Sequence, residues 1–536
     1  MDIIAATRHG KVRGRVDGSI ASYLGIPYAA APFGDHRFRA PAPVEPWEGI
    51  RDALEFGPTA PQRPYRPPLD QLIPDVDIPG EECLNLNVWA PQAVGEPLPV
   101  LVWIHGGSLR NGSAAMPLYD GRAFARDGVV LVSINYRLGV EGFGVFPDAP
   151  DNRGLLDQIA ALTWVRDNIA GFGGDPGRVT VCGESAGAIS IAALLTSPRA
   201  AGLFHRAILQ SGPPHTVTRD EGAGTVRAMA KALRVPATAE GFAGVDRERL
   251  LDVQDELVGR ADPVSGGPCF HIVVDDDVVP ADPPPPSVDL LLGCNREEYR
   301  LWFVPSGAVE RVSRLTLRLA LLKFRIPGRV ARLYRAGRPD ARPGVILGEM
   351  ATDLLLRGPL NRLADSRLTD SRPAGSQPAG SQPTDSQPGG SQPGGSRPAG
   401  SQRTDSQPGG SQPGGSRPAG SQRTDSQPGG SQPGGSRPAR TFFYEFAWRS
   451  PVLGLGACHA LEIGFVFDNL RHGEALSGPD APQPLADVMH RAWVDFTTSG
   501  DPGWTAWDTR RPVRVFDHPG TSTVLAPRQE ELRAWL

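Results

Sequence analysis

The stretch Gly183-Glu184-Ser185-Ala186-Gly187 directly follows the apolar run Val179 to Cys182, and the small and aliphatic residues Ala188 to Leu195 come after it. This order predicts a buried strand, a tight turn and a helix, with Ser185 at the apex of the turn. A bend sharp enough to project Oγ from a sheet leaves no room for a Cβ two residues before or after the serine, which accounts for the two glycines. Ser185 is therefore the candidate nucleophile.

The elements around this turn alternate as in a large, mostly parallel sheet. Continuous apolar runs at 100–104 and 129–134 predict strands that are buried on both faces. Residues 155–169 have helical spacing, and further short apolar runs at 207–210 and 288–292 predict additional strands. The strand–helix–strand order predicts an α/β fold.

The composition indicates a globular enzyme acting on a small molecule. A chain of 536 residues with 40% hydrophobic residues can bury a large core, which predicts one large catalytic domain. The formal charge of −4 comes without basic clusters, so we expect no nucleic-acid partner. No signal-like segment and no membrane-length apolar run is present, so we expect a cytoplasmic protein with no membrane partner, and we favour a monomer.

The cysteines predict neither a disulfide framework nor a zinc site. Their number is odd and no C-x-x-C pair occurs, so we expect reduced and mostly buried thiols. The five are Cys83, Cys182, Cys269, Cys294 and Cys458.

A low-complexity repeat interrupts the chain between residues 365 and 439. Its nearly identical twenty-residue copies start at Ser381, Ser401 and Ser421. The repeat has no large apolar residue to bury, which predicts a disordered insertion. Closing a loop of about 70 residues rather than about 10 costs only about 1.7 kcal/mol, so one catalytic domain formed by residues 1–364 and 440–536 can carry it.

A serine nucleophile needs a histidine base and an acid that orients it. In hydrolases with this kind of turn the partners follow in the order serine, acid, histidine. Glu297 and Glu298 lie just past the strand predicted at 288–292, at the edge where parallel sheets place active sites. The downstream histidines are His459, His472, His490 and His518. His459 is preferred because it lies in a glycine-bearing loop before an apolar segment.

Backbone N–H groups for an oxyanion are expected at the turn Ile104 to Ser108 and at Ala186, the residue after the nucleophile. Residues 301–303, Leu-Trp-Phe, are candidate walls of a pocket because they follow Glu298 closely. No motif with metal-ligand spacing is present, and Asp275 to Asp277 are interpreted as a solvated turn.

Together, the motifs resemble the type-B carboxylesterases, the cholinesterase-like branch of the α/β-hydrolases, and the bacterial carboxylesterases in particular. The resemblance implies an α/β-hydrolase fold with Ser185 as nucleophile, Glu298 as acid and His459 as base. Besides the serine turn, the stretches that carry it are Tyr23 to Ala29, Glu81 to Val88, Trp103 to Gly107, Asn135 to Arg137, Leu156 to Gln158 and Phe172 to Pro176.

The same resemblance implies Gly107, Ser108 and Ala186 as oxyanion donors and Ser211 as a supporting residue. The implied activity is hydrolysis of a carboxylic ester to acid and alcohol through an acyl-enzyme on Ser185, with ester and water as partners and no cofactor or metal. A thioesterase or amide-cleaving hydrolase with the same triad, and a non-catalytic cholinesterase-like binding protein, remain as alternatives.

The chain departs from the family pattern at several positions. Ser108 replaces a glycine or alanine, and Arg110 lies where an aromatic residue is common, which predicts a guanidinium near the pocket. Tyr299 replaces the glycine after Glu298, which predicts strain if that position needs a positive φ. Cys83 has no upstream cysteine, so the disulfide of secreted relatives cannot form, which favours an intracellular, bacterial-type enzyme.

Overall fold

The computed structural model describes residues 1–92, 95–259, 270–370 and 438–535. Most of the insertion predicted at 365–439 lies outside the described residues, and so does Cys269. Helix α13 (Gly358–Asp370) extends past the boundary expected at residue 364. The chain before and after the repeat belongs to one compact unit.

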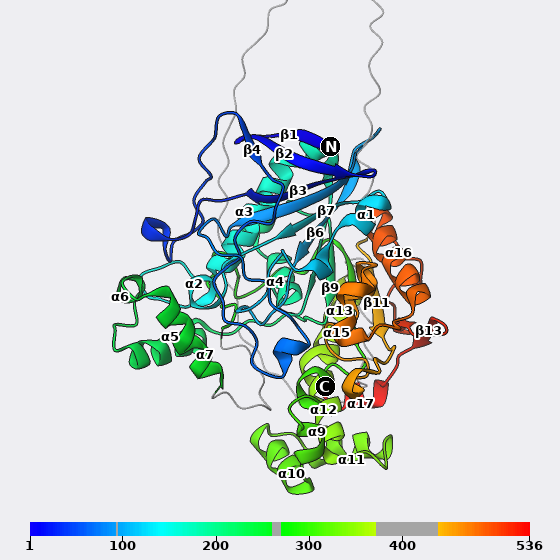
Figure 1. The fold of residues 1–536 in the computed structure, drawn as a ribbon. Helices are drawn as coiled ribbons and strands as arrows, with labels where there is room; N and C mark the ends of the chain where they lie inside the picture. The colour runs from blue at the N-terminus through cyan, green and yellow to red at the C-terminus, as the bar shows by residue number, and fades with distance from the viewer. Residues whose placement is uncertain (93–94, 260–269, 371–437, 536) are drawn as a thin grey trace, which may run out of the picture. The chain divides into compact units, whose positions relative to one another are not determined.

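The described strands form one mixed sheet of 13 strands, in the order β1-β2-β3-β5-β7-β6-β8-β9-β10-β11-β12-β13, with β4 paired to β2 (Figure 1). Pairing is parallel from β7 through β6, β8, β9, β10 and β11 to β12, and the strands β1, β2, β3, β5 and β7 pair antiparallel with one another in that order. The strands are β1 (Asp2–Thr7), β2 (Gly10–Asp17), β3 (Ile20–Pro27), β4 (Ile50–Asp52), β5 (Asn85–Pro91), β6 (Leu98–Ile104), β7 (Val130–Ile134), β8 (Gly174–Glu184), β9 (Arg206–Gln210), β10 (Asp289–Asn295), β11 (Thr441–Phe446), β12 (Pro512–Phe516) and β13 (Ser522–Leu525).

The helices lie between and after these strands, and every strand predicted from the sequence before the repeat is present. A π-helical turn, Asp353–Arg357, joins α12 to α13. The α-helices are α1 (Arg122–Arg126), α2 (Gly139–Phe143), α3 (Arg153–Asn168), α4 (Ala186–Leu194), α5 (Arg219–Leu233), α6 (Ala239–Ala243), α7 (Arg247–Gly259), α8 (Arg300–Phe303), α9 (Ala308–Arg311), α10 (Arg314–Lys323), α11 (Gly328–Ala336), α12 (Pro343–Thr352), α13, α14 (Ile463–Val466), α15 (Glu474–Ser477), α16 (Gln483–Ser499) and α17 (Gln529–Arg533).

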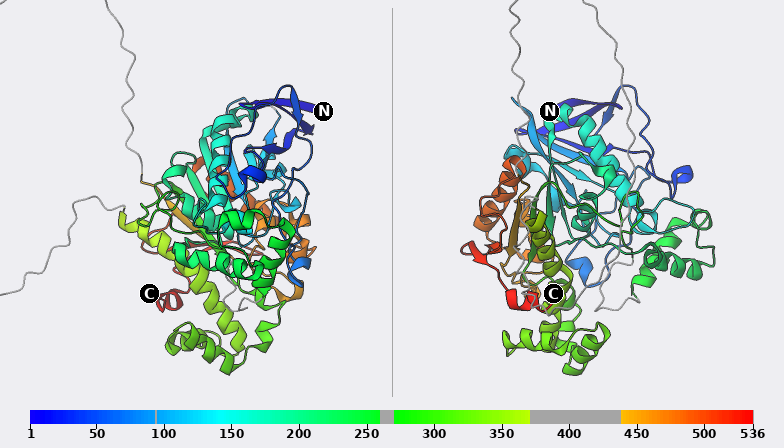
Figure 2. Two further views of the ribbon diagram at one scale, coloured as in Figure 1. Left: turned by 90° about the vertical axis from the view of Figure 1, so that its left-hand side faces the viewer. Right: turned by 180° about the vertical axis from the view of Figure 1, so that it is seen from behind.

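The central strands are buried on both faces because helices cover each side (Figure 2). On β6, Val100, Val102 and Ile104 pack into the core on the side of α3 and α4. The alternate residues Leu101 and Trp103 pack into the core on the side of α16. Successive side chains of a strand point to opposite faces of the sheet. A strand that is buried on both faces is therefore apolar at every position, as the continuous apolar runs in the sequence predict.

A third, smaller core lies within a helical cluster formed by α8 to α12. Leu317, Val330 and Ile346 are buried there together with Tyr299 and Phe303. The sequence did not predict this cluster, because its helices are short and apolar on more than one face. It joins the sheet just past β10, where Glu298 lies.

Candidate functional site

The turn between β8 and α4 has the crowded geometry that the sequence predicts. Ser185 has φ 54° and ψ −120°, a conformation that non-glycine residues rarely adopt. A Cβ on Gly183 would lie 2.8 Å from the carbonyl oxygen of Ile104, and a Cβ on Gly187 would lie 2.0 Å from the same atom. Both flanking positions therefore require glycine for β8 and α4 to approach β6.

His459 and Glu298 form a buried pair beside this turn. Nδ1 of His459 lies 2.6 Å from Oε2 of Glu298, and the other carboxylate oxygen of Glu298 accepts the backbone N–H of Asn295 at 2.7 Å. Glu298 follows β10 and His459 follows β11, and these two strands are parallel neighbours in the sheet. Their carboxyl ends therefore bring together an acid and a base that lie on opposite sides of the repeat.

The other ring nitrogen of His459 contacts a residue that the sequence analysis did not assign. Nε2 lies 2.9 Å from Oε1 of Glu184, the residue directly before the serine. No hydrogen bond joins Ser185 to His459 within the described residues. The second position of the G-x-S-x-G pattern accepts any residue, so the pattern alone holds no signal for Glu184.

Carboxylates control the protonation of this histidine. Burial opposes the imidazolium, but the charges of Glu184 and Glu298 outweigh it and raise the pKa of His459 well above its usual value. A third carboxylate, Glu462, is fully buried and accepts the side-chain N–H groups of Asn295 at 2.6 Å and Gln210 at 3.1 Å. Burial, followed by the charges of Glu184 and Glu298, raises the pKa of Glu462 to about 8.

The turn after β6 presents backbone N–H groups close to the serine. Gly107 has φ 114°, and a Cβ there would lie 2.0 Å from the carbonyl oxygen of Asn111. The carbonyl of Gly107 accepts the N–H groups of Arg110 and Asn111, whereas the N–H groups of Gly107 and Ser108 have no acceptor among the described residues. The hydroxyl of Tyr136 donates to the carbonyl of His105 at 2.7 Å and fixes the start of the turn.

Ala186 is the first residue of α4, so its N–H lacks an acceptor within the helix. Ser211, predicted to support the triad, lies just past β9, and its buried hydroxyl has no hydrogen-bond partner among the described residues. Its backbone N–H donates to the carbonyl of Gly293 at 2.8 Å. The structure thus places Ser211 just past β9, and within the described residues its hydroxyl makes no hydrogen bond to Ser185, Glu298 or His459.

A cavity of about 290 Å³ opens over the serine. Its wall includes Ser185, His459, Leu301 and Trp302, and the ring of Trp302 lies 4.9 Å from that of His459 between centroids. Phe303 instead packs into the helical cluster, so only two of the three predicted wall residues face the cavity. Further apolar wall residues are Leu69, Leu72, Ile73, Val76, Met116, Leu118, Ile463 and Leu476.

The structure shows the conformation and surroundings of the residues that depart from the family pattern. Tyr299 has φ −56° and ψ −21°, an ordinary helical conformation, so the strain predicted there is wrong. Arg110 is not among the residues that line the cavity. Ser108 lines it and has φ 57°. Cys83 is buried and unpaired, as are the other cysteines of the described ranges.

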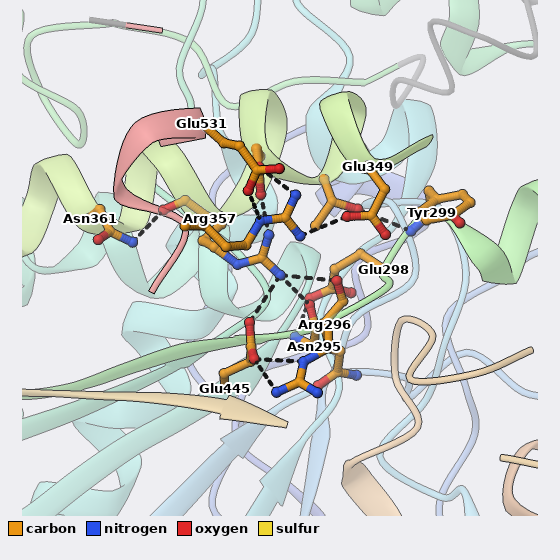
Figure 3. Close-up of polar contacts among 12 residues, drawn as sticks. Asn295, Arg296, Glu298, Tyr299, Glu349, Arg357, Asn361, Glu445 and Glu531 are labelled. Atoms are coloured by element: carbon orange, nitrogen blue, oxygen red, sulfur yellow. Dashed lines mark hydrogen bonds and ion pairs between the residues drawn. The ribbon is translucent and has the colours of Figure 1, made fainter. Parts of the chain in front are cut away.

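A buried arginine holds the loop that carries Glu298. Nη2 of Arg357 donates to the carbonyls of Asn295 at 3.3 Å and Arg296 at 3.0 Å, and it lies 3.3 Å from the carboxylate of Glu445 on β11 (Figure 3). Arg357 also pairs with Asp353 on the π-helical turn. Arg357 thereby links the π-helical turn after α12 to the backbone of the loop that carries Glu298, the predicted acid.

Comparison with known proteins places this architecture among the serine hydrolases of the α/β-hydrolase fold. The profile of the carboxylesterase family matches residues 2–315, more than half of the chain, and the chain belongs to that family. It is an ester-cleaving serine hydrolase.

The relatives support this assignment over most of the chain. The chain is 40% identical to the para-nitrobenzyl esterase of Bacillus subtilis (strain 168) over 373 residues. This match covers 66% of this chain and 74% of that protein. It is 33% identical to the phenmedipham hydrolase of Pseudarthrobacter oxydans, over 93% of this chain and 90% of that protein. The structure of a Geobacillus stearothermophilus carboxylesterase matches with a TM-score of 0.78 at 29% identity, over 99% of this chain and 100% of that one. Among the described residues, no helix combines the length and apolar character needed to cross a membrane.

Proposed function

We propose that Ser185, Glu298 and His459 carry out hydrolysis of an uncharged carboxylic ester through an acyl-enzyme. The observation that supports this most is the 2.6 Å contact between Glu298 and Nδ1 of His459, which leaves Nε2 directed toward the serine turn. Glu298 holds the imidazole in one tautomer and stabilises the imidazolium that forms during the reaction.

In this mechanism Nε2 of neutral His459 leaves Glu184 and takes the proton of Ser185 as Oγ attacks the ester carbonyl. The carbonyl electron pair moves to the oxygen, and the N–H groups of Gly107, Ser108 and Ala186 stabilise the resulting oxyanion. The alcohol departs with the proton from His459, and water repeats the steps on the acyl-enzyme.

The cavity favours small apolar esters. A volume of about 290 Å³ is at the lower end of the usual range for ligand pockets, and its wall is mostly apolar, with Trp302, Tyr65 and Tyr119 among aliphatic residues. The name of the para-nitrobenzyl esterase, a relative at 40% identity, supports an aromatic alcohol group. A thioester or amide remains an alternative substrate for the same triad, and the cytoplasmic location and monomeric state stay predictions.

The test is hydrolysis of p-nitrophenyl acetate, butyrate and octanoate by the wild-type protein beside Ser185→Ala and the control Ser522→Ala, a serine exposed on β13. We expect turnover in the wild type and the control, loss in Ser185→Ala, and falling kcat/KM for the octanoate because the cavity is small. A fluorophosphonate should label the wild type once, at Ser185. A folded wild type that neither turns over these esters nor is labelled would overturn the roles proposed here for Ser185 and His459.

A further inference from the structure

Helix α10 is apolar on two opposite faces. Leu317 and Ala320 are buried in the helical cluster. Leu315, Leu319 and Leu322 are 65%, 57% and 75% exposed. Their spacing of four and three residues places these three leucines in one stripe on the side away from the buried residues. We call this stripe the leucine patch.

Basic residues surround the leucine patch on both sides. On an ideal helix Arg314 and Arg318 flank one side of the stripe, and Lys323 flanks the other. Residues 311–335 contain no acidic residue, and their eight basic residues are all exposed. These are Arg311, Arg314, Arg318, Lys323, Arg325, Arg329, Arg332 and Arg335.

Three arginines of this region carry charge that no described carboxylate pairs with. No carboxylate of the described residues forms an ion pair with Arg314, Arg318 or Arg325. The whole chain has a formal charge of −4, so the region is a basic island on a slightly acidic protein. Figures 1 and 2 show α10 and α11 at the end of the molecule away from the N-terminal strands. Among the described elements, α12 and α17 pack against them and leave Leu315, Leu319 and Leu322 exposed.

We propose that the leucine patch and its basic border dock this esterase on an anionic lipid surface. Leucines that enter the boundary between headgroups and acyl chains leave water, while the surrounding arginines meet phosphate groups of opposite charge. A helix with a charged border and exposed leucines on the same side is the arrangement that lies flat in such an interface. The geometry requires no membrane-spanning segment.

The basic border argues against two other occupants of the patch. A second copy of this chain, docked patch to patch, would bring the two sets of arginines against each other, which is unfavourable. The repeat between residues 371 and 437 contains no leucine, isoleucine, valine, methionine or aromatic residue to pack on the leucines. An anionic bilayer matches both the exposed leucines and the basic residues around them. The proposal therefore departs from the sequence-based expectation of no membrane partner.

The experiment is co-sedimentation of the full-length protein with vesicles of phosphatidylglycerol and phosphatidylcholine, and with vesicles of phosphatidylcholine alone. We expect binding to the anionic vesicles, weak binding to the neutral ones, and release at about 1 M salt, where the Debye length is about 3 Å. The triple variant Leu315→Ser, Leu319→Ser, Leu322→Ser should bind at least about tenfold more weakly. Removing arginines with Arg314→Gln and Arg318→Gln should weaken binding by roughly fivefold each.

The matched control replaces two exposed leucines elsewhere, Leu453→Ser and Leu525→Ser, whose side chains are 69% and 57% exposed. All variants alter exposed residues outside the cavity, so turnover of p-nitrophenyl butyrate in the absence of vesicles should stay at the wild-type level and report intact folding. Anionic vesicles that fail to bind the wild type, or that bind the leucine variant and the control equally, would overturn the proposal. The wild type could instead form a dimer that the leucine variant does not form and that vesicles do not disrupt. That result would overturn the proposal and assign the patch to self-association.

Discussion

Replacing Gly187 with alanine tests whether the close approach of α4 to β6 sets the geometry of catalysis. The added Cβ would lie 2.0 Å from the carbonyl oxygen of Ile104 and 2.9 Å from that of His105, and both are backbone atoms that cannot rotate away. Since Cβ contacts below about 3 Å essentially do not occur, the start of α4 and the end of β6 must separate by about 1 Å. We therefore expect Gly187→Ala to lower the free energy of unfolding by about 1–3 kcal/mol.

The separation of α4 from β6 should reduce kcat by more than the loss of folded protein alone would explain. Ala186 lies on one side of the gap, and Gly107 lies on the other, so the proposed oxyanion donors move apart. A displacement of about 1 Å at a reacting centre costs on the order of 100-fold in rate. We expect kcat for p-nitrophenyl butyrate to fall by that order, with a smaller change in KM, measured below the onset of thermal unfolding.

The matched control is Gly328→Ala, because Gly328 also lies at the start of a helix and a Cβ there would meet nothing within 4 Å. That variant should keep wild-type kcat and gain up to about 1 kcal/mol of stability. If Gly187→Ala retains wild-type kcat, the crowding at the turn does not set the position of the oxyanion donors and the reasoning is refuted.

Three further predictions concern the same site. Glu184→Gln removes a carboxylate that raises the pKa of His459. Because only the neutral imidazole is a base, the acid limb of the profile of kcat/KM against pH should move to lower pH. An acid limb that stays at the wild-type pH would contradict the contact between Glu184 and His459. Ser185→Gly should be inactive yet more stable to urea than Ser185→Ala by about 1 kcal/mol, because glycine tolerates the positive φ. Arg357→Met removes one of the two arginines that pair with each of the buried carboxylates Asp353 and Glu445, and it should cost about 3 kcal/mol in denaturant titrations, whereas the exposed Arg332→Met should change stability by less than about 0.5 kcal/mol.

The parts of the structure that the sequence predicted are those whose reason lies within a few residues. The turn at Ser185 and its two flanking glycines are one example, because a strand, a bend and a helix follow each other directly. The two-sided burial of β6 is another, since alternate residues along a strand face opposite cores. Helix α5 had a usable local signal that was not applied: Thr218 and Glu221 form a capping box at its start.

Features that depend on distant residues could not be predicted in this way. The contact of Glu184 with His459 exists because β8 and the loop after β11 end at the same edge of the sheet. Trp302 faces the cavity while its neighbour Phe303 faces the helical cluster, a choice that packing makes and spacing does not. Tyr299 was expected to be strained, and only the helical start of α8 shows that it is not.

The buried thiols affect how this enzyme responds to reactive chemicals. Cys182 lies in β8 shortly before the serine and Cys458 lies next to His459, and burial raises the pKa of both thiols well above its usual value. A protonated, inaccessible thiol is a poor target for alkylation or peroxide. Thiol-directed oxidation or alkylation of Cys182 and Cys458 should therefore not inactivate the enzyme, and covalent inactivation should require a reagent that reacts with other groups of the cavity, such as Ser185 or His459.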